Sequence, residues 1–146
     1  MGPRTRVNPV MKTLLFASLL ALAACGGGGG SPSSTDFNET PAAVLTTSTY
    51  QVALHCAPDQ EPSRGVNSLE LLVTRTSDGT PVDGLDVTVV PFMPAMGHGG
   101  SVKPTVTAGH APGVYRVTNV NLFMPGLWEL RTTIATEHAT AQFDIP

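Results

Sequence analysis

The chain has 146 residues, of which 8 are basic and 11 acidic, and its formal net charge is −3. Three of the basic residues, Arg4, Arg6 and Lys12, precede an apolar run; without them five basic and eleven acidic residues remain, a net charge of −6. This acidic balance argues against a nucleic-acid-binding protein and against electrostatic attachment to anionic lipid.

The first 24 residues have the pattern of a secretory leader. A basic stretch leads into an apolar run over residues 14–24, which is about half the length that a bilayer-spanning helix needs. Its end, Leu22-Ala23-Ala24-Cys25, resembles the lipobox of bacterial lipoproteins, which implies cleavage before Cys25 and lipidation of its sulfur. We therefore predict a lipoprotein that is anchored in a membrane and faces the periplasm, or that resides in the outer membrane. An ordinary cleaved signal followed by a free cysteine is the alternative.

Three segments are predicted from this pattern. Residues 1–24 are the signal peptide, and residues 25–48 are a lipidated cysteine followed by a tether rich in glycine and serine, whose composition cannot bury enough apolar surface to fold. Residues 49–146 are long enough for one hydrophobic core and too short for two. We expect a single domain there.

The domain shows apolar and polar residues in alternation, interrupted at intervals by Gly, Pro and Asp. This pattern predicts an all-β fold, an immunoglobulin-like antiparallel β-sandwich of about seven strands, with an open barrel as the alternative. The strands are expected at residues 50–56, 69–74, 85–89, 102–107, 114–120, 128–134 and 139–145. Pro104 confines the fourth strand to the edge of a sheet, because proline cannot donate a ladder hydrogen bond.

A cluster of soft side chains lies in the third connection, Met93-Pro94-Ala95-Met96-Gly97-His98. Pro94 suits the second position of a type I turn, and Gly97 permits a positive φ. Antiparallel strands place the first, third and fifth connections at one end of the sandwich. That end therefore gains Met124 from the fifth connection, where Pro125-Gly126 fits a turn. The same count places His110 and His138 at the opposite end.

Thioethers select Cu(I), and imidazole binds copper in either oxidation state. The four side chains Met93, Met96, His98 and Met124 therefore form a candidate metal site, with Cu(I) as the expected cofactor. The alternative is that the methionines fill irregular space in the core and that His98 is solvated.

Two residues beside this end have simpler expected roles. Cys56 is expected to be a core residue rather than a ligand, since it alternates with the buried face of its strand, and His55 is expected at the surface.

These turns resemble a known family. Met93-Pro94-Ala95-Met96-Gly97-His98-Gly99, then Pro112-Gly113-Val114-Tyr115, then the segment from Met124 to Leu130 are similar to the YtkA-like domain, which is related in pattern to FixH-like proteins. The resemblance covers residues 69–145. It implies a small exported β-sandwich, often lipid-anchored, with a non-enzymatic role associated with copper or oxidase assembly. The chain departs from FixH-like proteins in having a lipoprotein leader where they have a membrane helix.

Two functions follow as hypotheses. The first is a module of the cell envelope that binds Cu(I) or a similar soft metal at the end of the sandwich that carries Met93, Met96, His98 and Met124, which we call the Met/His end. The second is a metal-free structural or interaction module that docks an envelope protein at the same end. Enzymatic activity is not expected, because the chain has no nucleophile elbow, no phosphate-binding glycine loop and no paired carboxylates at a recognisable spacing.

Overall fold

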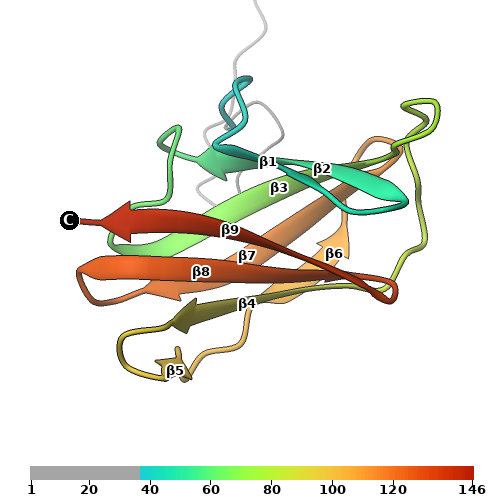
Figure 1. Ribbon diagram of the computed structural model, residues 1–146. Coiled ribbons are helices and arrows are strands. Elements are labelled where there is room, and N and C mark those ends of the chain that lie inside the picture. Colours follow the sequence, from blue (N-terminus) through green and yellow to red (C-terminus); the bar gives the residue numbers. More distant parts are fainter. Residues whose placement is uncertain (1–36) are drawn as a thin grey trace, which may run out of the picture.

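A computed structural model describes residues 37–146, which form two antiparallel sheets packed against each other (Figure 1). The strands are β1 (Ala43–Thr46), β2 (Tyr50–Ala57), β3 (Gly65–Arg75), β4 (Val87–Met93), β5 (His98–Gly99), β6 (Thr105–Ala108), β7 (Val114–Leu122), β8 (Gly126–Ile134) and β9 (Glu137–Ile145). One sheet has the order β1-β2-β3-β7-β6 and the other β5-β4-β8-β9. The predicted antiparallel sandwich is confirmed. The predicted leader and Cys25 lie outside the described residues.

All seven expected strands are present among the described residues, and β1 and β5 are additional. β1 corrects the predicted boundary of the tether, because it pairs with β2 along its whole length and buries Leu45 in the core. The expected strand at 85–89 is displaced to Val87–Met93. Leu85 does not join it, because its backbone N–H donates instead to the Tyr115 hydroxyl at 2.9 Å. The strand expected at 102–107 is β6, which begins only after Pro104; its predicted edge position is confirmed, since β6 ends its sheet.

The core lies between the inner faces of the two sheets. Alternate residues of β2 are fully buried, as the sequence pattern predicts, and Trp128 and Leu130 face them from β8. Cys56 is one of the buried β2 residues, which confirms its expected core position. Burial raises the pKa of the Cys56 thiol to about 11, so the side chain stays protonated at neutral pH.

The described residues before β1 cover the outer face of the five-stranded sheet. His55 Nδ1 lies 2.8 Å from the backbone oxygen of Asn38, and the Phe37 ring lies 5.3 Å from the guanidinium of Arg116. The prediction that His55 is a surface residue is therefore wrong: it is half-buried. The error has a simple source, because the covering residues fall in the segment predicted to be tether.

The two lateral sides of the sandwich differ. On one side β1 lies beside β9, and the Glu137 carboxylate accepts hydrogen bonds from Ser48 Oγ at 2.6 Å and from the Thr49 hydroxyl at 2.7 Å. These hydrogen bonds hold the pKa of Glu137 at about 2. On the other side β4 and β6 belong to different sheets and do not pair. The hydrogen bonds of Glu137 thus link the two sheets on the first side, and we call the second side, where a groove lies between β4 and β6, the open side.

Candidate metal centre at one end of the sandwich

Strand register shows which connections share an end of the sandwich. Gly65 of β3 pairs with Leu122 of β7, and Phe92 of β4 pairs with Glu129 of β8. The connections after β2, β4 and β7 therefore lie at one end, which is the end of the chain's C-terminus in Figure 1. His110 lies in the β6–β7 connection and His138 is the second residue of β9, and both are at the opposite end. The placement expected from counting connections holds.

The two methionines of the β4–β5 hairpin differ in their exposure to solvent. Met93 O accepts hydrogen bonds from Met96 N at 3.1 Å and from Gly97 N at 3.0 Å, which confirms the turn expected around Pro94. Gly97 has the expected positive φ, 69°. Met93 is the last residue of β4 and points into the core with 4% of its surface exposed, whereas Met96 at the turn is 51% exposed. Of the pair, only Met96 is open to solvent.

His98 begins β5 opposite Met93 and is exposed. Its Nδ1 lies 3.1 Å from the backbone oxygen of Gly99. With the proton on Nδ1, the ring donates to this oxygen and leaves the Nε2 lone pair free toward solvent. Metal-binding histidines use the same arrangement, in which a carbonyl holds one ring nitrogen and the other binds the ion.

The β7–β8 turn is fixed by the only tryptophan of the chain. Trp128 is fully buried, and its indole Nε1 donates to Met124 O at 2.9 Å. The Phe123 ring packs edge-on against the indole with centroids 5.5 Å apart. Met124 is partly buried against the core. The sequence pattern did not predict this role of Trp128; its position four residues after Met124 of the Met-Pro pair was the available signal.

The Met93 side chain lies close to the β7–β8 turn. A Cβ placed on Gly126 would lie 2.8 Å from Met93 Cε, so the thioether of Met93 passes beneath the turn that carries Met124. The structure therefore brings Met93 against the second turn from within, and Met96 and His98 project from the first turn outside. All four predicted ligands therefore lie at one end of the sandwich, with Met93 and Met124 packed against the core and Met96 and His98 at the surface.

The β2–β3 loop, which also lies at this end, is held by a buried amide side chain that the sequence pattern did not predict. Asn67 is 3% exposed; its Nδ2 donates to Ser63 O at 2.8 Å and its Oδ1 accepts from Ser63 N at 2.9 Å. These hydrogen bonds pin the β2–β3 loop. Arg64 from this loop donates to Phe123 O at 3.3 Å, which links the loop to the β7–β8 turn.

The donor chemistry at this end is soft. Within residues 37–146 there is no group of three or more His, Cys, Asp or Glu side chains that could hold a metal ion. Thioethers and one imidazole fit Cu(I).

The described part of the chain contains no helix with the length and hydropathy of a membrane span. The family model described as YtkA-like matches residues 45–133. Searches of curated proteins and of solved structures gave no match.

Proposed function

Because the chain belongs to the YtkA-like family, we propose that it is an exported, lipid-anchored, non-enzymatic module that binds Cu(I) at its Met/His end. The ligands in this proposal are Met93, Met96, His98 and Met124, and the lipid is attached at Cys25. The anchor would hold the domain at the membrane surface on the exported side, where the module buffers the ion or passes it on.

The observation that carries the metal proposal is the geometry of His98. Its Nδ1 lies against a backbone oxygen of its own hairpin, and the ring is exposed, so Nε2 is both accessible and oriented. Met96 is exposed two residues earlier on the same turn. A soft ion bound at the turn would therefore meet an imidazole and a thioether without any change in the fold.

Met93 and Met124 supply the inner half of the proposed donor set. Met124 is partly buried and Met93 almost fully, so both are held close to the hairpin by packing rather than by solvation. Methionine has three rotatable side-chain bonds and adapts readily to irregular space. In this proposal Met124 completes the site by a rotamer change, and Met93 does so at the expense of its core contacts.

Competition titration with a chromophoric Cu(I) chelator on the full chain tests the proposal. Met96→Ile and His98→Ala are each expected to weaken Cu(I) binding by at least about tenfold. His110→Ala, which removes an exposed histidine at the opposite end, is the matched control and should leave the affinity unchanged. Unchanged affinity after changing Met93, Met96 and Met124 together to Ile would refute the ligand assignment.

Lipid attachment is tested separately, by metabolic labelling with a radioactive fatty acid in the native host. The wild-type chain is expected to incorporate label and to sediment with membranes, whereas Cys25→Ala should do neither. Label retained by the Cys25→Ala variant would contradict the assignment of this residue.

A second candidate function has its own support. Met96, Phe123 and Leu127 belong to the same end of the sandwich and are 51%, 39% and 43% exposed, which suits a contact surface for an envelope protein. Affinity capture with the metal-free chain distinguishes the two functions. A specific partner that is retained without copper and lost on Met96→Asp would favour the interaction module over the metal site.

A further inference from the structure

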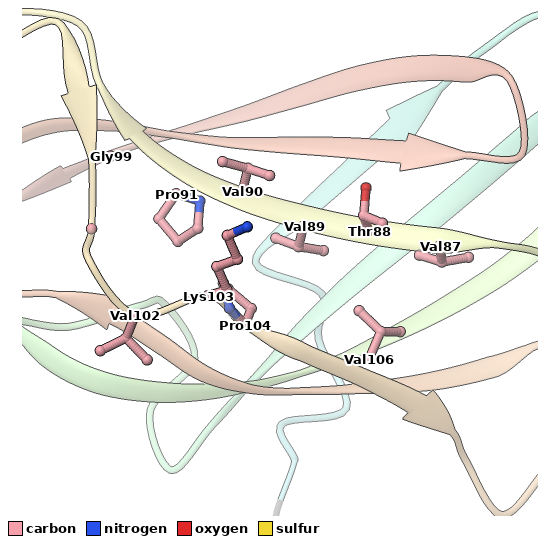
Figure 2. A pocket seen from close by; sticks show the side chains of 11 residues that line it. Val87, Thr88, Val89, Val90, Pro91, Gly99, Val102, Lys103, Pro104 and Val106 are labelled. Carbon is pink, nitrogen blue, oxygen red and sulfur yellow. The ribbon is translucent and has the colours of Figure 1, made fainter.

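The open lateral side of the sandwich contains a groove between β4 and β6, with a volume of about 560 Å³ (Figure 2). Its walls are mostly apolar: Val87 and Val89 come from β4, and Val102, Pro104 and Val106 come from the segment that runs into β6. The gap continues past Val87 toward Asp86 and Ala108. An unpaired sheet edge beside an apolar groove is a place where an extended peptide can add a strand.

Among residues 37–146, the β4 edge along this groove carries backbone groups with no strand partner. Asp86 O accepts a hydrogen bond from Ala135 N at 2.8 Å. This hydrogen bond lies next to the paired residues Val87 and Ile134, so these two residues form a non-hydrogen-bonded pair of the β4–β8 ladder. The N–H and C=O groups of Val87 therefore point away from β8, and those of Val89 follow because the pattern repeats every second residue. β5 pairs only with Phe92 and Met93. Val87 and Val89 thus present free donors and acceptors to the groove.

Pro91 shows which edge of β4 faces the groove, and it lies where the groove ends. A Cβ on Gly99 would lie 2.5 Å from Pro91 O, so this oxygen points toward β5 and away from β8. From Phe92 onward β5 occupies the edge, and Figure 2 shows the chain turning from Gly99 through Val102 to Pro104 around that end. An added strand can run along Val87 to Pro91 and must stop there. At about 3.3 Å per residue, the available edge accommodates four or five residues.

Lys103 places a positive charge at the closed end of the groove. The Lys103 side chain extends from the β5–β6 connection toward β4 in Figure 2, and no acidic residue lines the groove with it. No carboxylate among residues 37–146 forms an ion pair with Lys103. If an added strand ends at the Lys103 ammonium, a carboxylate at the end of that strand would have the complementary charge.

We propose that the β4–β6 groove binds the C-terminal tail of a partner protein, which adds to β4 as a parallel strand and places its terminal carboxylate at Lys103. Backbone hydrogen bonds to Val87 and Val89 supply the pairing, and apolar side chains at alternate positions of the tail fill the space beside Val106. This site is distinct from the Met/His end.

The probe is a fluorescein-labelled peptide, Ser-Gly-Thr-Val-Thr-Val with a free C-terminal carboxylate, titrated against the full chain in detergent by fluorescence anisotropy. The control is the same peptide with a C-terminal amide. The acid is expected to bind about fivefold more tightly than the amide, the size of effect typical of a partly exposed ion pair. Lys103→Gln should abolish this difference. Equal binding of acid and amide by the wild-type chain would overturn the carboxylate assignment.

The backbone pairing has its own matched variants. Val89→Pro removes the N–H that faces the groove and leaves the β4–β8 hydrogen bonds intact, as Pro91 does two residues later. Val89→Ala loses the same side-chain packing but keeps the N–H. Binding of the acid peptide should be weaker in the proline variant than in the alanine variant by about fivefold or more. Peptide binding should also slow hydrogen exchange at residues 87–90. Equal binding by both variants, or a dimer in native mass spectra that Val89→Pro dissociates, would overturn the proposal.

Discussion

Replacing Gly126 by alanine tests how the two turns of the Met/His end are held together. Two effects oppose an added Cβ: the backbone has φ of 120°, and the Cβ would lie 2.8 Å from Met93 Cε. A side chain at such a φ costs on the order of 1–3 kcal/mol. The contact is with the far end of a flexible side chain, which can move aside with less cost. We therefore predict that Gly126→Ala lowers the free energy of unfolding by about 1–3 kcal/mol, chiefly through backbone strain.

Urea unfolding followed by the fluorescence of Trp128, the single tryptophan, measures this change. A double-mutant cycle with Met93→Ala separates the two effects. If strain dominates, Gly126→Ala costs the same in the Met93→Ala background to within about 0.5 kcal/mol. If its cost disappears there, the contact with Met93 dominates and the reasoning is wrong. Gly100→Ala is the control, because its Cβ would meet nothing closer than 3.5 Å and its φ is not positive; its effect should stay within about 0.5 kcal/mol.

Three further predictions concern groups away from the two turns. Cys56, buried with a pKa of about 11, should resist alkylation at pH 8 in the native chain and react only in denaturant, as peptide mass spectrometry would show; rapid native labelling would mean that the core opens there. Glu137 has a pKa lowered from 4.5 to about 2 by hydrogen bonds, so its contribution to stability is complete above pH 4.5 and is lost as the pH falls toward 2. Glu137→Gln should lower the melting temperature at pH 7 and flatten its pH dependence in that window; parallel curves for the two chains would contradict this. Tyr115→Phe removes a hydroxyl that accepts from one backbone N–H and donates to one backbone oxygen of the β3–β4 connection, and it should cost about 1–3 kcal/mol in urea unfolding; a cost below about 0.5 kcal/mol would mean that water replaces both bonds.

The sequence was most informative where burial alternates with period two. β2 and β8 each bury every second residue, so their faces could be assigned without a structure. β1 and β5 have four and two residues, too few for alternation to be detected. β1 is held by pairing with β2 and by the burial of Leu45, which are tertiary effects that local pattern does not encode.

The end of the sandwich that carries the candidate site could also be predicted, because it follows from the alternating directions of the long strands, and the additional strand β5 runs in the same direction as β6 and leaves that alternation unchanged. Which methionine faces solvent could not. Met93 and Met96 are three residues apart, and their opposite exposure follows from the point at which β4 ends and the turn begins. That point is set by hydrogen bonds from Met96 N and Gly97 N to Met93 O. The Trp128 indole at Met124 O is likewise a contact of three-dimensional packing.

The two-residue strand β5 joins the Met/His end to the lateral groove. His98, its first residue, pairs with Met93 and holds the exposed imidazole, while Gly99, its second, approaches Pro91 O so closely that any Cβ would collide with backbone. The absence of a side chain on Gly99 is therefore what allows the hairpin to lie against β4 at all. Because that same contact closes the groove beside Lys103, one glycine determines both where His98 is presented and where an added strand must end.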